Sequence, residues 1–213
     1  MIALVAGASG LTGSELVKIL EQDERVIRIY VLTRKPIEGY TEKTTQVYFE
    51  KNINEVNVLP GPNPDVVFCC LGTTIKKAGS REAFRFVDVE LVKQLIVCSE
   101  HWGATCFVLQ SSVGAGQKTR NFYLQCKAEA EAILNHSSIP FKRIIRPSLL
   151  LGKRKEQRFG ETAGKILAAL FGFLFLGWLK RYKPVQAKNV ALQMLNMAMN
   201  LTDGQQVKES EQI

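Results

Sequence analysis

Three glycines, with two residues between each and the next, stand near the amino terminus in the stretch VAGASGLTGSELV, residues 5–17. They follow the apolar run 2–6 and open a segment with a helical pattern of apolar residues. A strand that turns at once into a helix uses glycine, because the turn is tight and the helix packs closely on the strand. The chain therefore begins with a strand–turn–helix unit.

Short apolar runs alternate with helical patterns along most of the chain. The predicted strands are 2–6, 27–32, 45–48, 66–70, 106–110 and 141–145, and the predicted helices are 13–22, 81–102 and 122–136. Most of these strands are continuously apolar, as expected for strands covered on both faces. Between the third and fourth strands only a short helix, or none, is expected. The pattern predicts an α/β fold, a Rossmann-type doubly wound and mostly parallel sheet, in one domain over residues 1–213.

The composition changes after Gly152, where a basic loop leads into a strongly apolar stretch. We expect residues 153–202 to form a small C-terminal helical portion that binds substrate or acts as a lid, including an amphipathic helix around 190–201. The polar tail at 203–213 is expected to be disordered.

The glycine turn has the residues that a bound diphosphate requires. One glycine permits the tight turn, another lets the backbone approach the phosphates, and the free N–H groups of the helix then face the anion. The hydroxyls of Ser9 and Thr12 add donors. The predicted phosphate-binding residues are Gly7, Ser9, Gly10, Leu11, Thr12 and Gly13. Because the turn directly follows a strand and precedes a helix, the context favours a nucleotide site.

Two further strand ends indicate which nucleotide is bound. The second strand ends without the Asp or Glu that selects NAD and instead carries Arg34 and Lys35, which could bind a 2′-phosphate. We therefore expect NADP(H) to be preferred over NAD(H). The fourth strand ends at Leu71, Gly72 and Thr73, where a small residue would let the cofactor pass close to the backbone.

The charge and the cysteines exclude several other classes. The net charge of +8 suggests anionic ligands, but the basic residues form no long run, so we expect no nucleic-acid partner. The five cysteines have no Cys-x-x-Cys spacing and no histidine partners, which argues against disulfides or a metal site. With reduced thiols and no recognisable signal peptide, the protein is expected to be cytoplasmic.

The apolar stretch at 166–179, followed by Lys180 and Arg181, has three interpretations. It could be a helix that covers the substrate pocket, an exposed lid that contacts a protein partner, or a weak interfacial membrane contact through 166–181. It is shorter than the roughly 20 residues that a membrane-spanning helix needs. All three interpretations suit an apolar substrate or partner.

The order of these motifs resembles the short-chain dehydrogenase/reductase superfamily. The glycine turn, FCCLGTT, LQSSVGA, NFYLQCK and RPSLLLG occur in the superfamily's order. FCCLGTT, NFYLQCK and the Arg-Pro with its following leucines are similar to the Tat-interacting-protein-like group of atypical members. The resemblance extends over roughly residues 2–200.

The resemblance implies a catalytic set. Tyr123 would exchange a proton with the substrate's carbonyl or alcohol oxygen, and Lys127 would ease the loss of that proton and hold the nicotinamide ribose. Both residues would contact the cofactor. Ser112 would hydrogen-bond the same substrate oxygen, with Ser111 as the alternative. Pro147 would lie at the nicotinamide pocket. One proton donor and one further hydrogen-bond donor are what a carbonyl oxygen needs when it gains charge during hydride transfer.

Two functions remain open from the sequence. The first is an NADPH-dependent oxidoreductase that acts on a carbonyl or alcohol of an apolar small molecule. The alternative is a regulatory sensor that binds NADP(H) and acts through protein partners with little or no turnover. The intact Ser112, Tyr123 and Lys127 favour the enzyme, because a sensor does not need them.

Overall fold

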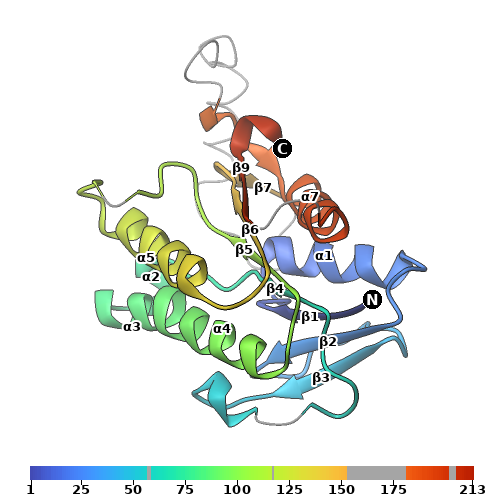
Figure 1. Ribbon diagram of the computed structural model, residues 1–213. Helices are drawn as coiled ribbons and strands as arrows, with labels where there is room; N and C mark the ends of the chain where they lie inside the picture. The colour runs from blue at the N-terminus through green and yellow to red at the C-terminus, as the bar shows by residue number, and fades with distance from the viewer. Residues whose placement is uncertain (57–58, 117, 153–180, 202–204) are drawn as a thin grey trace.

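A parallel sheet forms the middle layer of the molecule, with helices on both faces (Figure 1). The computed structural model describes residues 1–56, 59–116, 118–152, 181–201 and 205–213. The strands of the sheet are β1 (Ile2–Ala6), β2 (Arg28–Thr33), β3 (Thr44–Tyr48), β4 (Val66–Cys69), β5 (Cys106–Gln110), β6 (Phe141–Arg146) and β9 (Gln205–Glu209). Their order is β3-β2-β1-β4-β5-β6-β9, and every pair is parallel. The predicted Rossmann-type fold is confirmed.

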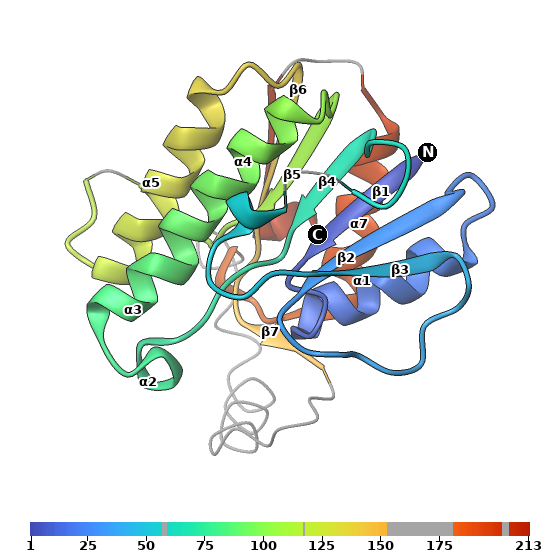
Figure 2. The same ribbon diagram turned by 90° about the horizontal axis from the view of Figure 1, so that it is seen from below.

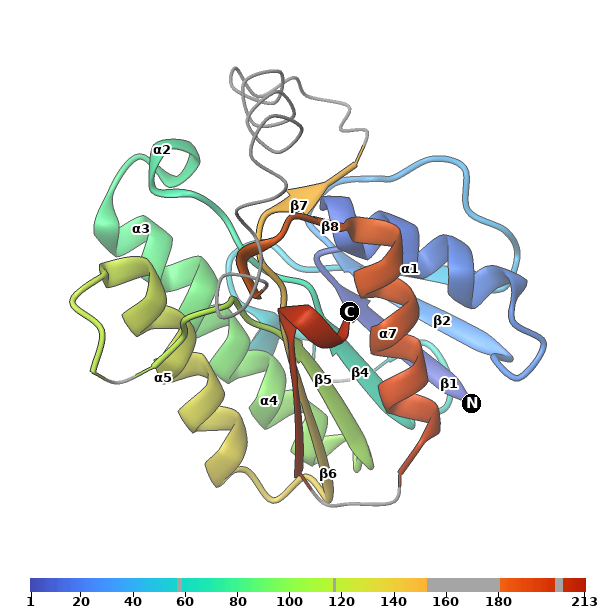
Figure 3. The ribbon, with the colours of Figure 1, turned by 90° about the horizontal axis from the view of Figure 1, so that it is seen from above.

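Two groups of helices cover the sheet. The helices are α1 (Leu11–Gln22), α2 (Ile75–Ala78), α3 (Arg81–Arg85), α4 (Leu91–His101), α5 (Phe122–His136) and α7 (Ala187–Met199), with the shorter turns η1 (Ile53–Glu55), η2 (Phe86–Glu90) and η5 (Ser210–Gln212). Figure 2 shows α3, α4 and α5 on one face, and Figure 3 shows α1 and α7 side by side on the other. The strands β1, β2, β4, β5 and β6 therefore send side chains into two separate apolar cores, one on each face of the sheet.

The predicted helix at 81–102 is interrupted. It consists of α3, the π-helical turn η2 and α4, and only η1 lies between β3 and β4. A π turn inserts one extra residue into a helix and often marks a functional position. Here it contains Asp88, a buried carboxylate between two valines.

Only part of the predicted C-terminal substrate or lid portion, residues 153–202, lies within the described residues. Residues 153–180, with the apolar stretch, lie outside the described residues. α7 follows the short pair of strands β7 (Leu150–Leu151) and β8 (Val185–Gln186) and packs against α1 with Val190, Ala191 and Met194 in the core. This helix therefore belongs to the core on the α1 face of the sheet, and the substrate or lid role of residues 153–202 stays a prediction.

The expectation of a disordered tail is wrong for residues 205–213, which the structure describes. β9 pairs with β6 from Lys142 opposite Gln205 to Arg146 opposite Glu209. Arg146 forms ion pairs with Glu209 at 2.7 Å and with Glu131 of α5 at 2.6 Å. The polar composition suggested disorder, but an edge strand needs few apolar residues when its backbone completes a sheet.

We expect Glu131→Gln to lower the free energy of unfolding by about 2 kcal/mol, because it leaves the guanidinium of Arg146 with only one carboxylate in a largely buried position. Urea unfolding would measure the change. The control is Glu15→Gln, which breaks the exposed pair with Lys18 and should change stability by less than about 0.5 kcal/mol. Equal effects of the two changes would contradict the structural role of Arg146.

None of the helices within the described ranges has both the length and the apolar character needed to span a membrane.

Candidate active site

The candidate site lies at the carboxyl edge of the sheet, where β1 and β4 are neighbours. The chain runs outwards from β1 to β3 and then returns to β4, so the strand order reverses between β1 and β4. Ligands of doubly wound sheets bind at such a reversal, beyond the carboxyl ends of the strands. The glycine turn follows β1 here, and residues Cys70 to Thr73 follow β4.

Backbone contacts in the glycine turn leave no room for larger residues at two positions. Gly7 has a φ of +85°, and a Cβ there would lie 2.5 Å from the carbonyl oxygen of Cys70. A Cβ on Gly13 would lie 2.3 Å from the carbonyl oxygen of Gly7. The amide of Gly10 donates to that same oxygen at 2.9 Å and closes the turn. These glycines hold α1 close against β1 and β4.

The start of α1 fits a bound diphosphate. Gly10 provides no side-chain cap, and the first turn contains no acidic residue, so neither feature competes with an anion for the N–H groups of the helix. The hydroxyl of Thr12 is buried without a hydrogen-bond partner among the described residues, while Ser9 is exposed beside it. The side chain of Leu11 lies against Gly152. The turn thus offers donors that the rest of the described chain leaves unused.

The loop after β4 passes close to the predicted catalytic residues. Gly72 is exposed, and a Cβ on it would lie 3.5 Å from both Oδ1 of Asp88 and Nζ of Lys127. Leu71 packs into the core beneath it. The amide of Thr73 donates to Oδ2 of Asp88 at 2.9 Å. Gly72 therefore leaves open the space above the Asp88–Lys127 pair.

α5 carries Tyr123 and Lys127 on one face, one helical turn apart. Asn121 caps the helix by accepting a hydrogen bond from the amide of Leu124. The ring of Tyr123 packs on Phe84 with 5.9 Å between the ring centroids. Lys127 is buried, and its Nζ lies 2.8 Å from Oδ1 of Asp88.

The two serines after β5 differ in burial. Ser111 is buried, and its hydroxyl has no hydrogen-bond partner among the described residues. Ser112 is half-buried, and its hydroxyl makes one long contact of 3.5 Å to the carbonyl of Val113. The amide of Val113 donates to the carbonyl of Pro147 at 3.0 Å, which joins the ends of β5 and β6. Both hydroxyls remain candidates for the substrate oxygen.

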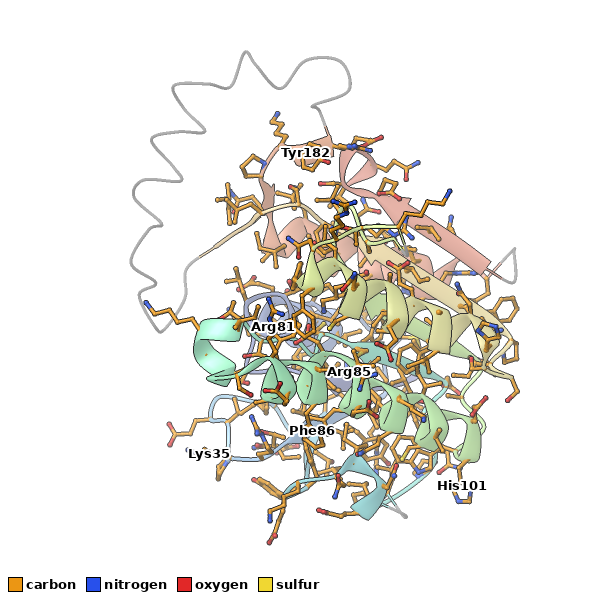
Figure 4. The ribbon with its side chains drawn as sticks, turned by 90° about the vertical axis from the view of Figure 1, so that its left-hand side faces the viewer. Lys35, Arg81, Arg85, Phe86, His101 and Tyr182 are labelled. Carbon is orange, nitrogen blue, oxygen red and sulfur yellow. The ribbon has the colours of Figure 1, made fainter. Side chains whose placement is uncertain are left out.

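Arg34 and Lys35 follow β2 at the same edge of the sheet and are exposed (Figure 4 labels Lys35). The hydroxyl of Thr33 donates to the carbonyl of Lys35 at 2.7 Å and shapes this turn. Arg34 makes no ion pair with a described residue, and its guanidinium is therefore available to an external anion.

Asp88 is a site residue that the sequence interpretation missed. It is 0% exposed and contacts Lys127 and the backbone of Thr73, both predicted to bind the cofactor. The available signal was an aspartate between two valines in the run FVDVELV, which also contains Glu90. Within the described ranges, no group of three or more His, Cys, Asp or Glu side chains could hold a metal ion.

The fold and this site define the class of NAD(P)-binding oxidoreductases with a Rossmann fold. Residues 2–85 match the family model "Semialdehyde dehydrogenase, NAD binding domain". Among solved structures, UDP-glucose 4-epimerase of Thermotoga maritima with UDP-glucose is similar at a TM-score of 0.71 and 15% identity, covering 97% of this chain and 75% of that one. The enzyme WbmH of Bordetella bronchiseptica in complex with NAD+ has a TM-score of 0.70 and 15% identity, covering 98% and 75% of the two chains.

Curated relatives identify the family more closely. Protein HTATIP2 of Rattus norvegicus is 32% identical over 206 residues, covering 94% of this chain and 82% of the relative. Protein FMP52, mitochondrial, of Candida albicans is 29% identical over 211 residues, covering 96% and 91%. The chain therefore belongs to the HTATIP2 and FMP52 family of atypical short-chain dehydrogenases/reductases.

The expectation of a cytoplasmic protein is corrected by these relatives. FMP52 is described as mitochondrial in Candida albicans, Debaryomyces hansenii and Saccharomyces cerevisiae. All five cysteines are free thiols, and four of them are buried. Free thiols indicate a reducing environment but do not name the compartment.

Proposed function

We propose that this protein uses NADPH to reduce the carbonyl group of an apolar small molecule, or NADP+ to oxidise the matching alcohol. The observation that carries the proposal is the position of Tyr123 one turn before Lys127 on α5, with Nζ of Lys127 beside the open backbone at Gly72. A nucleotide turn and a Tyr–Lys pair at one edge of the sheet fit a redox step better than simple nucleotide storage.

The residues of the chain have separate tasks in this reaction. When bound, NADPH supplies the hydride that the substrate's carbonyl carbon accepts. The hydroxyl of Tyr123 gives its proton to the carbonyl oxygen and regains one from solvent, and Ser112 or Ser111 donates a hydrogen bond to the same oxygen. The ammonium group of Lys127 stabilises the tyrosinate that remains. In the oxidation of an alcohol the proton moves in the opposite direction.

An apolar substrate is supported by Leu149, which follows Pro147 at this edge of the sheet and is 59% exposed. An exposed leucine next to a polar site can cover the apolar part of a bound molecule. A contact with a protein partner or a membrane through 166–181 stays a prediction, because residues 153–180 lie outside the described ones.

The test of the function is NADPH consumption with a panel of apolar aldehydes, ketones and quinones. Turnover of one of these classes is expected. If none is turned over while NADPH binds and changes the affinity of a protein partner, the enzyme proposal fails and the regulatory sensor replaces it.

Arg34→Ala should weaken NADPH binding about tenfold or more and leave NADH binding nearly unchanged, because only NADPH carries the 2′-phosphate that Arg34 would bind. Fluorescence titration with each nucleotide would measure both affinities. Lys93→Ala, which removes an exposed charge from α4, is the control for the change in net charge. Equal losses for NADPH and NADH would contradict the proposed preference for NADP(H).

A further inference from the structure

Asp88 is a buried carboxylate whose two contacts both lie in the candidate site. Its Oδ1 lies 2.8 Å from Nζ of Lys127, and its Oδ2 accepts the amide hydrogen of Thr73 at 2.9 Å. These contacts connect three segments that are distant in sequence: the loop after β4, the π turn η2, and α5. One side chain thus joins the backbone next to Gly72 to the predicted catalytic helix.

Stability alone gives a weak reason for this arrangement. Burying two charges costs desolvation energy, and apolar residues of similar size in place of a buried ion pair are often neutral or stabilising. Val87 and Val89 flank Asp88, so the local sequence already supplies apolar side chains. The π turn that contains Asp88 is also less favourable than a regular helix and is frequent at functional sites.

The groups that face Lys127 come from three elements. They are Asp88 on η2, Cys69 on β4 with Cys70 directly after it, and Tyr123 and Cys126 on α5. Burial raises the pKa of the Cys70 and Cys126 thiols. Burial raises the pKa of the Cys69 thiol to about 11, so that this thiol is neutral near pH 7. Asp88 is therefore the permanent negative charge beside Lys127 among the described residues.

The charges near Asp88 on the outer face of the helix are paired with one another. Arg85 contacts Glu90 and Glu129, and Figure 4 shows Arg85 and Phe86 on that face. These groups do not compensate the buried Lys127.

The burial of Lys127 makes its charge depend on a counterion. Burial by itself lowers the pKa of Lys127, but Asp88 and Tyr123 oppose this effect, and the net result is a raised pKa. Without the carboxylate of Asp88, burial would still lower the pKa of Lys127, and only Tyr123 and Cys69 would oppose it. Buried lysines without a counterion can lose their proton near neutral pH.

We propose that Asp88 is a positioning residue that keeps Lys127 charged and fixes it, together with the Gly72–Thr73 backbone, in the place where the nicotinamide end of the cofactor binds. This inference rests on the proposed function, because it assigns Lys127 to the cofactor. Asp88 itself is fully buried and needs no contact with substrate.

Asp88→Asn tests the proposal first without cofactor. The asparagine can still accept from the amide of Thr73, but the negative charge is lost. In the native protein the raised pKa of Lys127 keeps its stabilisation constant from pH 7 up to the unfolded-state pKa of about 10.4. In Asp88→Asn the folded pKa falls below that value, so the unfolded state binds more protons in this range. The stability deficit of the variant should therefore shrink as the pH rises from about 7 to 10 in urea unfolding.

The second measurement is NADPH binding over pH 6 to 9, followed by nucleotide fluorescence. The ratio of the dissociation constants of Asp88→Asn and the native protein should rise about tenfold across this range, because a neutral Lys127 loses its charge-assisted hydrogen bonds. Titration of the nucleotide's own phosphate cancels in this ratio. Glu131→Gln is the matched control, because it removes a carboxylate one helical turn from Lys127 and breaks a different pair, with Arg146, while Asp88 stays in place. Its ratio should not change with pH.

If Asp88→Asn folds poorly, a double variant tests whether Asp88 acts through Lys127. Lys127→Met combined with Asp88→Asn has no buried charge at this position and should bind NADPH as Lys127→Met alone does.

Each outcome has a separate meaning. If the native protein binds no NADPH or NADH, the proposed function falls and this inference falls with it. If the native protein binds but Asp88→Asn follows the native pH dependence in both measurements, the inference alone is overturned. It is also overturned if Glu131→Gln gives the same pH dependence, or if Asp88→Asn weakens NADPH binding further in the Lys127→Met protein.

Discussion

Tyr123→Phe is expected to lower NADPH-dependent turnover by roughly a thousandfold, within the range of 10²–10⁴ that a positioned proton donor contributes. The substitution removes only the hydroxyl. The ring can still pack on Phe84, 5.9 Å away between centroids, so folding should be unaffected. NADPH affinity should change by less than about threefold, because Lys127 and the glycine turn remain intact. Steady-state kinetics with the best substrate of the panel would measure the loss.

Tyr30→Phe is the matched control for this prediction. Tyr30 is buried in β2, and its hydroxyl donates to the carbonyl of Pro62 at 3.1 Å. Losing that bond should cost about 1 kcal/mol of stability and leave turnover unchanged. If Tyr123→Phe keeps more than about a tenth of the native rate, another group donates the proton and the assignment of Tyr123 is wrong.

The central sheet could be predicted from the sequence because parallel strands are buried on both faces and therefore appear as continuous apolar runs. β1 and β5 begin and end at the predicted residues. The second strand begins one residue later than predicted, at Arg28, and Ile27 before it is 67% exposed despite its apolar side chain. The glycine turn was also recognisable, since its spacing and its place between strand and helix have a direct steric cause.

Two features depend on contacts across long sequence distances and could not be predicted in this way. Asp88 meets Lys127 only after η2 and α5 pack together, and an acidic residue between apolar ones does not indicate its partner. β9 has one strongly apolar residue, Val207, and owes its place to backbone pairing with β6 and to the pair of Glu209 with Arg146. In both cases tertiary contacts decide the structure. Local composition predicted disorder where β9 forms, and it gave no partner for Asp88.

Replacing Gly13 by alanine should lower the stability of the protein strongly, whereas replacing Gly72 by alanine should leave it nearly unchanged. In Gly13→Ala the new Cβ would lie 2.3 Å from the carbonyl oxygen of Gly7 and within 3 Å of two further backbone atoms. Backbone cannot move aside cheaply, so we expect the free energy of unfolding to fall by about 3 kcal/mol. In Gly72→Ala the Cβ would meet Asp88 and Lys127 at 3.5 Å, an ordinary contact, and the residue is exposed. The stability of this variant should stay within about 0.5 kcal/mol of the native value.

NADPH affinity then shows whether Gly72 matters for cofactor binding independently of stability. Gly72→Ala should weaken NADPH binding at least about tenfold although the protein is fully folded, because its methyl group fills the space above Lys127 that we assign to the cofactor. Urea unfolding and fluorescence titration on the same preparations would give both numbers. A Gly72→Ala protein that binds NADPH as tightly as the native one would show that the cofactor does not pass over this strand end. A Gly13→Ala protein of native stability would contradict the close contact between α1 and the turn, which is the physical reason for a glycine at that position.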